Sequence, residues 1–207
     1  DDMLSGDLVP PSIPNPTGSA PDQQMPGILQ DFEGLNNRNG YLPPDTVGDV
    51  GPNHYVQMVN SSLQIFNKDG STALGPVDSN TIWTDLGGDC ATTNDGDPIV
   101  LHDQFADRWL VSQFSYSGAG LHECVAVSTS NDPTGSWHLY QFDYDSFPDY
   151  PKIGVWPDGY YVTYNMFDPD TFDYEGVKIC ALDRNAMIAG DPATQQCRDL
   201  TTEWSML

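Results

Sequence analysis

The sequence predicts an all-β protein built of β-propeller-like blades, each a small four-stranded sheet. The first observation is an internal repeat, in which a polar turn leading into an aromatic strand recurs about every 50 residues. The second is composition: 26 of the 30 acidic residues are Asp, and 19 Gly and 17 Pro accompany them, which favours turns over helices. The third is an aromatic content of 11% that falls in alternating runs. A β-sandwich, which also has short, closely spaced strands, is the alternative.

Before the repeat lies a proline-rich stretch, residues 1–27, with prolines at positions 10, 11, 14, 16, 21 and 26 and little hydrophobic pattern. Such a composition is typical of an extended lead or linker. We expect ordered structure to begin near residue 28, so the predicted propeller-type domain covers residues 28–207.

The three copies of the repeat are residues 51–59, 102–112 and 155–163, aligned on Tyr55, Trp109 and Tyr161. The second copy shows a complete blade, because polar turns separate four alternating segments at 99–102, 109–115, 123–129 and 137–142. One helix is expected, at 184–189, with Asp183 as its N-cap and Gly190 directly after its last turn.

The chain from residue 32 to residue 207 has room for about three blades and part of a fourth. A propeller normally closes with four to eight blades. We therefore expect an incomplete ring, truncated at its C-terminal end, which further chain or another copy of the protein would complete.

The charge and hydropathy of the chain exclude two classes of partner. A net charge of −23 argues against nucleic acid, because binding to phosphate backbones needs clustered Lys and Arg. No apolar run approaches the ~18 residues of a membrane helix, so no membrane span is expected.

Four cysteines allow three disulfide connectivities. We predict Cys90 with Cys124 and Cys180 with Cys197, because each pair closes a local loop. Four reduced thiols in a cytosolic protein are the alternative. Disulfides together with an Asp-rich, Lys-poor surface predict an extracellular, secreted protein, whose signal peptide would already have been removed.

Several motifs resemble the opening of a family of secreted bacterial proteins, most of them without an assigned activity. The segments are residues 43–57, 95–100 with 106–109, and 149–152 with 155–158. This resemblance implies a propeller-like fold and carries no activity with it. In addition, residues 128–137 are similar to the S-x-D-P-x-G-x-W turn of family-43 propeller glycosidases and to the Asp-box turns of sialidases, where the turn has a structural role.

The resemblance to propeller glycosidases implies where catalytic acids would lie. Such enzymes use two carboxylates that flank the sugar bond, and in five-bladed glycosidases these acids lie where the innermost strands open onto the central cavity. The matching acids, each at the start of a repeat, are Asp49, Asp97 and Asp149. The alternative is that these residues cap the turns that lead into the strands.

Two further details bear on a catalytic interpretation. The pair Asp97-Pro98 is similar to the R-D-P motif of invertase-like enzymes, and Glu123-Cys124 is similar to their E-C motif. Gly96 stands in place of the Arg, however, and Glu123 falls on the same predicted blade as Asp97 rather than on another. Trp109 and Tyr164 are the aromatic residues expected to contact a sugar, with packing between blades as the alternative.

Calcium is the predicted cofactor, because it is bound by six to eight oxygens that often come from Asp clusters on loops. The predicted ligands are Asp95 and Asp97 in one run and Asp168, Asp170 and Asp173 in another. Solvated acidic loops are the alternative interpretation.

Together these patterns predict an extracellular propeller-type module that recognises a glycan or a partner surface and is stabilised by calcium and disulfides. A glycoside hydrolase or lyase on the same fold is the first alternative. A structural component of a surface layer or filament, with the proline-rich lead joining neighbouring copies, is the second.

Overall fold

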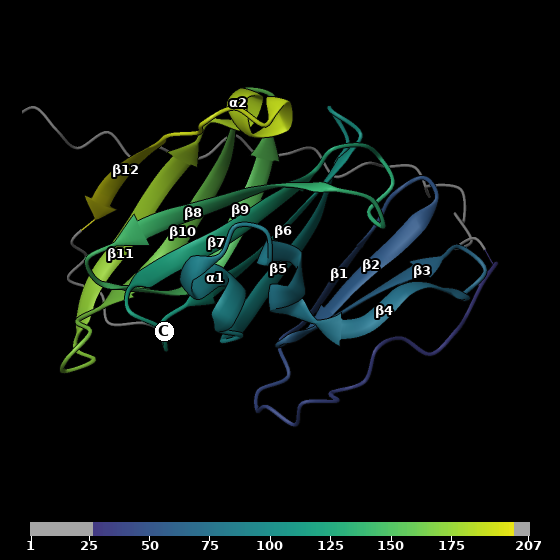
Figure 1. Ribbon diagram of the computed structural model, residues 1–207, viewed down its shortest axis with the longest axis horizontal. Coiled ribbons are helices and arrows are strands. Elements are labelled where there is room, and N and C mark those ends of the chain that lie inside the picture. Colours follow the sequence, from purple (N-terminus) through teal and green to yellow (C-terminus); the bar gives the residue numbers. More distant parts are fainter. Residues whose placement is uncertain (1–26, 201–207) are drawn as a thin grey trace, which may run out of the picture.

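A computed structural model describes residues 27–200, which form three four-stranded antiparallel sheets, one after another along the chain (Figure 1). The predicted proline-rich lead therefore lies outside the described residues except for Gly27. Blade 1 consists of β1 (Thr46–Val50), β2 (His54–Val59), β3 (Ser62–Asn67) and β4 (Thr72–Asp78). Blade 2 consists of β5 (Gly96–Asp103), β6 (Arg108–Ser115), β7 (Leu121–Ser128) and β8 (Trp137–Tyr144). Blade 3 consists of β9 (Phe147–Trp156), β10 (Gly159–Phe167), β11 (Tyr174–Leu182) and β12 (Gln195–Leu200).

The arrangement of the sheets confirms the predicted all-β, propeller-like fold. In each blade the strands pair in sequence order, and the first strands lie next to each other, β1 beside β5 and β5 beside β9. The strands that carry Trp109 and Tyr161 belong to separate sheets, so the chain does not form a sandwich. The three sheets do not close into a ring. Within residues 27–200 no strand belongs to a fourth blade, because β12 completes the third.

Apolar side chains between neighbouring blades form two cores. Between blades 1 and 2, Met58 and Ile65 pack with Trp109 and Val111, and between blades 2 and 3, Val125 packs with residues of β10. The register corrects one detail of the predicted repeat. Trp109 lies opposite His102 in the pairing of β5 with β6, and Tyr160 lies opposite Val155 in the pairing of β9 with β10. Tyr160, not Tyr161, therefore occupies in blade 3 the position that Trp109 occupies in blade 2. Burial agrees, since Trp109 and Tyr160 are fully buried while Tyr161 is 41% exposed.

The segment before β1 covers the outer face of blade 1. The ring of Phe32 lies against Tyr55 and Phe66, with centroid distances of 6.3 and 5.5 Å. The amide of Leu35 donates to the Gln57 side chain at 2.7 Å, which fixes the segment to β2.

Both predicted disulfides are present. Cys90–Cys124 joins α1 (Gly88–Thr92) to β7, and Cys180–Cys197 joins two directly paired residues of β11 and β12. Each bond closes a loop between blade elements and so restricts the unfolded chain.

The predicted helix is confirmed as α2 (Arg184–Ala189). The Asp183 side chain accepts a hydrogen bond from the Ala186 amide at 3.1 Å, and Gly190 ends the helix with a φ of 77°. Two short helical segments between blades 1 and 2 were not predicted, namely the 3₁₀ helix η1 (Ser79–Trp83) and α1. Among residues 27–200, no helix has the length and apolarity needed to cross a membrane.

Candidate functional site

Three carboxylates from three different blades meet at the start of the inner strands. Asp45 precedes β1, Asp97 is the second residue of β5, and Asp149 is the third residue of β9. Asp45 and Asp97 line one cavity of about 340 Å³ together with Tyr150 and Lys152. Asp149 lines an adjoining cavity of about 620 Å³ that has Tyr150 and Lys152 in common with the first. We call Asp45, Asp97, Asp149, Tyr150 and Lys152 the inner-strand cluster.

Bulges in the inner strands aim these side chains. In β5, two residues, Asp97 and Pro98, occupy the stretch between the paired residues Gly96 and Ile99, where the register with β6 shifts. In β9, Tyr150 and Pro151 do the same between Asp149 and Lys152. Such bulges bend a strand and redirect its side chains, and they are frequent next to functional sites.

The backbone of the cluster has an uncommon conformation. Asp45, Asp97 and Tyr150 have φ values of 42°, 47° and 53°, in the left-handed region that few residues other than Gly adopt. Such conformations are retained where the surrounding structure enforces them, and they gather at ligand sites. Each of the three blades therefore contributes one residue of this conformation to the cluster.

Gly96 explains why the R-D-P resemblance breaks at that position. Its φ is 110°, a conformation that residues with a side chain rarely adopt, and a Cβ there would overlap the side-chain oxygen of Asn60. An arginine before Asp97 would therefore strain the backbone and displace Asn60. Asn60 in turn donates to Asp45 at 3.3 Å and fixes that carboxylate.

Asp97 and Asp149 hold their protons more tightly than isolated aspartates do. Burial, together with the nearby carboxylates of Asp45 and Asp149, raises the pKa of Asp97 to about 6 against the opposing effect of Lys152. Burial also raises the pKa of Asp149, with Asp45 adding to the shift. At mildly acidic pH, Asp97 is therefore able to donate as well as accept a hydrogen bond.

Lys152 and Tyr150 supply the cationic and aromatic parts of the cluster. The Lys152 ammonium lies 3.5 Å from the centroid of the Tyr150 ring, within cation–π range, and donates to the Pro151 carbonyl at 3.0 Å. The Tyr150 side chain is 54% exposed. The cluster therefore presents carboxylates, one ammonium and one open aromatic face to the same space.

Behind the cluster lies Glu123, which is fully buried on β7 facing blade 3. In the described residues neither carboxyl oxygen accepts a hydrogen bond of good geometry, and the nearby Ser112 hydroxyl is the group that favours ionisation most. Burial, with a smaller contribution from Asp97, raises its pKa to about 8. The hydroxyl groups of Tyr144 and Tyr164, 3.1 Å apart, lie in the same interface between blades.

The predicted acids divide between two ends of the inner strands. Asp97 and Asp149 belong to the inner-strand cluster, as the sequence analysis expected for innermost strands. Asp49 lies at the far end of β1, where its carboxylate accepts hydrogen bonds at 2.7 Å from the amides of His102 and Val50. That role ties β1 to β5. The third acid of the cluster is Asp45, which sequence reasoning missed, although the intervals from 45 to 97 and from 97 to 149 are equal.

The two predicted sugar-binding aromatics are both buried. Trp109 is fully buried between blades 1 and 2, where its Nε1 donates to the Asn131 carbonyl at 3.2 Å, so no ligand reaches it. Tyr164 forms part of the wall of the larger cavity but is only 1% exposed. Packing between blades, the stated alternative, is the outcome for both. The exposed aromatic of the cluster is Tyr150.

Two of the predicted calcium ligands, Asp95 and Asp168, already accept hydrogen bonds from backbone amides. Asp95 accepts from the Tyr116 and Ser117 amides at 2.8 and 3.0 Å, and Asp168 accepts from the Asp170 and Thr171 amides at 2.9 and 2.8 Å. Across residues 27–200, no three Asp, Glu, His or Cys side chains are placed to hold a metal ion. Calcium binding, including a role for Asp173, stays a prediction that melting in calcium and in chelator would test.

Comparisons with known proteins include a distant structural likeness. No family model matches the chain, and no curated protein matches it. Among solved structures, the chain is similar to an exo-beta-1,3-galactanase from Phanerochaete chrysosporium determined with galactose, at 12% identity and a TM-score of 0.39. The match covers 67% of this chain and 42% of that one, so this chain spans less than half of the enzyme.

Proposed function

We propose that this chain is an extracellular β-propeller-type module that binds a glycan at the inner-strand cluster. The observation that carries the proposal is the convergence of Asp45, Asp97 and Asp149, from three blades, beside the exposed ring of Tyr150. Carboxylates accept hydrogen bonds from sugar hydroxyls, and an aromatic face packs on the apolar face of a pyranose ring. A few polar groups around a concave space are typical of ligand sites.

The charge of the cluster favours a neutral sugar over an acidic one. Three carboxylates face one ammonium, and the whole chain carries a net charge of −23, which repels uronic acids and sulfated glycans. Two disulfides support the extracellular setting, because such bonds persist in oxidising compartments.

Titration calorimetry with a panel of neutral and acidic oligosaccharides tests the proposal. We expect binding of a neutral glycan that is lost in the double variant Asp97→Asn, Asp149→Asn and weakened in Tyr150→Asn. Asn is the chosen replacement at 97 and 150 because it tolerates the left-handed backbone. Asp85→Asn, at an exposed site outside the cluster, is the matched control. Unchanged affinity in the double variant, with the fold intact, would refute this site.

A glycoside hydrolase on the same fold is the second candidate function. The specific observation is Asp97, whose pKa of about 6 suits a general acid, beside the carboxylate of Asp149. On this hypothesis Asp97 protonates the leaving oxygen and Asp149 acts on the opposite side of the bond. Release of reducing ends from a bound neutral glycan, with activity falling as pH rises through about 6, would support it. Binding without turnover leaves glycan recognition as the function.

A further inference from the structure

Four aromatic side chains form a continuous cluster at the junction of blades 2 and 3. Phe114 and Phe147 are the inner pair, which is buried, with ring centroids 5.1 Å apart. Tyr116 lies against both of them, at 5.7 and 5.2 Å, and Phe172 lies against Phe147 at 6.3 Å. These two outer rings are 47% and 59% exposed. We call Phe114, Tyr116, Phe147 and Phe172 the aromatic ledge.

The aromatic ledge lies at the same end of the blades as the inner-strand cluster. Phe147 begins β9 two residues before Asp149, so their Cα atoms are about 7 Å apart along the strand. Phe114 is paired with Gly96, the residue before Asp97. The exposed rings lie on loops farther out in each sheet, after β6 and before β11. The ledge therefore extends outward from the carboxylates of the cluster.

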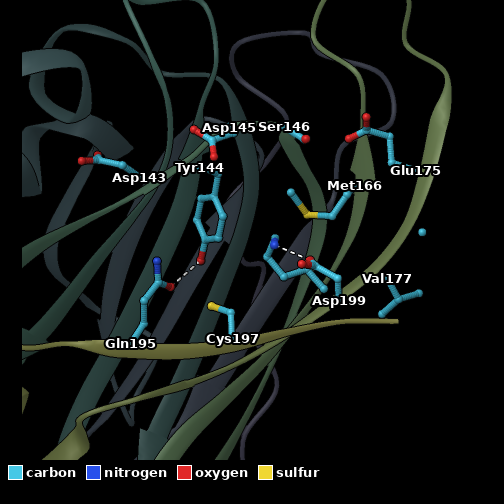
Figure 2. A pocket seen from close by; sticks show the side chains of 12 residues that line it. Asp143, Tyr144, Asp145, Ser146, Met166, Glu175, Val177, Gln195, Cys197 and Asp199 are labelled. Atoms are coloured by element: carbon cyan, nitrogen blue, oxygen red, sulfur yellow. Dashed lines mark hydrogen bonds and ion pairs between the residues drawn. The ribbon is translucent and has the colours of Figure 1, made fainter. Parts of the chain in front are cut away.

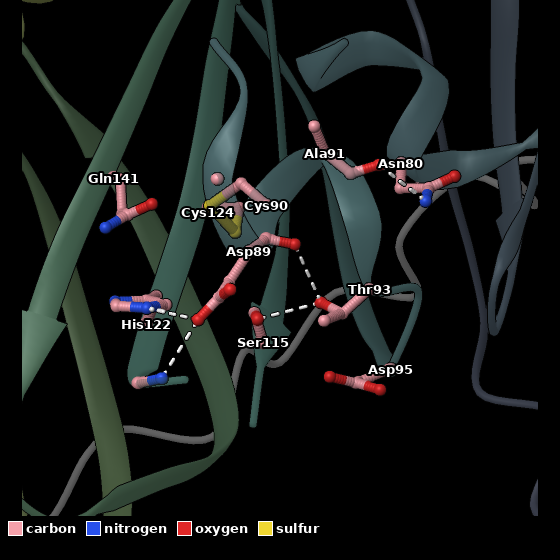
Figure 3. The surroundings of a disulfide bond; sticks show 12 residues. Asn80, Asp89, Cys90, Ala91, Thr93, Asp95, Ser115, His122, Cys124 and Gln141 are labelled. Carbon is pink, nitrogen blue, oxygen red and sulfur yellow. Dashed lines mark hydrogen bonds and ion pairs between the residues drawn. A yellow bond between two sulfur atoms is a disulfide. The ribbon is translucent and has the colours of Figure 1, made fainter. Parts of the chain in front are cut away.

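The loop that carries Tyr116 is fixed by a carboxylate. Asp95 accepts hydrogen bonds from the Tyr116 and Ser117 amides at 2.8 and 3.0 Å, and from the Ser117 hydroxyl at 2.7 Å. Figure 3 shows Asp95 near Thr93, whose hydroxyl donates to Ser115 at 2.8 Å. A side chain on a loop that is already fixed loses little freedom when a ligand packs on it.

Phe172 is exposed on a backbone that does not suit a large residue. Its φ is 58°, in the left-handed region where a bulky side chain is rarely found. The loop enforces this conformation, because the Phe172 amide donates to the Asp168 carbonyl and the Asp168 amide donates to the Asp173 carbonyl, both at 2.9 Å. Gly or Asn would fit with less strain. A strained backbone that presents an exposed ring is typical of a ligand contact.

The size and surroundings of the ledge favour a sugar over a protein. Two half-exposed rings offer about 200 Å² of aromatic surface, whereas a stable protein interface buries roughly 800 Å² of each partner. Asp170 and Asp173 are exposed on the loop of Phe172. Figure 2 shows Asp145 and Ser146 in the turn that leads into β9, across a cavity of about 450 Å³ from Glu175. Such carboxylates and hydroxyls bond to sugar hydroxyls.

We propose that the aromatic ledge is a second sugar-binding subsite, so that the ligand is a neutral oligosaccharide that runs from the inner-strand cluster across the junction of blades 2 and 3. Tyr116 and Phe172 pack on the apolar faces of the outer sugars, while the carboxylates of the cluster bind the hydroxyls of the inner ones. This inference rests on the proposed glycan binding and adds to it the length of the ligand.

Titration calorimetry with neutral oligosaccharides of graded length tests the ledge. The probes are linear chains of glucose, galactose, xylose or mannose, from monosaccharide to hexasaccharide. We expect wild type to bind a hexasaccharide about tenfold more tightly than the disaccharide of the same series. The ledge variant, Tyr116→Ser with Phe172→Asn, should bind both chains with the affinity of the disaccharide. Phe105→Asn, which removes a ring that is 62% exposed in the turn between β5 and β6, at the opposite end of blade 2, is the matched control.

The outcomes separate the ledge from the inner-strand cluster. Equal affinity of wild type for short and long chains, or unchanged hexasaccharide binding by the ledge variant, would overturn the ledge and leave the cluster standing. Absence of binding to every probe would refute both proposals. Self-association of wild type in sedimentation that the ledge variant abolishes would assign the ledge to a protein contact and contradict the sugar subsite.

Stability gives a readout that needs no ligand. Phe172→Asn should unfold at the same or a higher denaturant concentration than wild type, because the lost ring is exposed and Asn tolerates the left-handed backbone. A clear loss of stability in this variant, beyond that of Phe105→Asn, would show that the ring serves to hold the loop and would count against its role as a ligand contact.

Discussion

Arg184 forms a bidentate ion pair with Asp103, although the two residues lie 81 positions apart in the chain. The guanidinium Nε is 2.7 Å from one carboxylate oxygen, a terminal nitrogen is 3.0 Å from the other, and Tyr160 donates to the first at 2.8 Å. Asp103 is fully buried and ends β5, while Arg184 begins α2 behind blade 3. The pair therefore holds blade 2 against blade 3 at the end opposite the inner-strand cluster.

Removal of Asp103 should be strongly destabilising. Asp103→Ala leaves a buried guanidinium and the Tyr160 hydroxyl without their acceptor, and breaking such a pair costs about 3–5 kcal/mol. Urea unfolding monitored by tryptophan fluorescence measures this. Asp199→Ala, which breaks the exposed pair with Lys178, is the matched control and should cost no more than about 1 kcal/mol. Equal effects of the two variants would show that the buried pair does not hold the blades together.

Glu123 should make the protein less stable as pH rises. Its pKa is raised by burial from 4.5 to about 8, so the folded state binds its proton more tightly than the unfolded state does. Its contribution is complete below pH 4.5 and is lost progressively up to about pH 8. Glu123→Gln should therefore be more stable than wild type at pH 9, by several kcal/mol in order of magnitude, and similar at pH 4. Melting curves of Glu123→Gln and wild type across this pH range measure the difference, with Glu175→Gln as an exposed control. A difference in stability that does not change with pH would contradict this prediction.

Asp97 should reduce stability for the same electrostatic reason. Burial and the nearby carboxylates raise its pKa from 3.8 to about 6, so ionisation disfavours the folded state as pH rises through that range. Asp97→Asn should melt at a higher temperature than wild type at pH 8 and at a similar temperature at pH 4. A residue that lowers stability yet is placed by a bulge in a strained backbone is typical of a functional site. A lower melting temperature of the variant at pH 8 would contradict this account of the cluster.

The two disulfides should contribute unequally. The chain-entropy model gives about 4 kcal/mol for the 34-residue separation of Cys90 and Cys124 and about 3 kcal/mol for the 17-residue separation of Cys180 and Cys197. Peptide mapping without reduction should recover both pairs. Double Ser variants of each pair, compared by chemical denaturation, give the two contributions, and free thiols in the folded protein would refute both bonds.

The fold was largely predictable because its determinants are local. Alternating strands, polar turns and the Asp183 and Gly190 caps act over a few residues, so blade 2 and α2 appear where the sequence predicts them. The short segment α1 was missed because no hydrophobic period marks five residues. The burial of Cys90 in the disulfide with Cys124 helps to hold α1 in place.

The site was predictable only in part. Asp97 and Asp149 follow from the repeat. The sequence alone does not show that the third acid is Asp45 rather than Asp49, because this depends on the register of the paired strands. Trp109 is of a residue type that suits sugar binding, and no pattern in the neighbouring sequence shows that blade 1 covers it. The ion pair of Asp103 with Arg184 is a contact between distant segments, which no sequence pattern marks.

Chemical-shift mapping by NMR tests the central claim most directly, because it reports the site of binding and not only its existence. On addition of a neutral oligosaccharide, the account predicts that the perturbed amides come from three segments, one in each blade, namely residues 45–47, residues 97 and 99, and residues 149, 150 and 152. The same titration on Asp85→Asn should give the same map. Perturbation confined to a single blade, or to the outer face of blade 3 around Trp156 and Tyr161, would contradict glycan recognition by the inner-strand cluster.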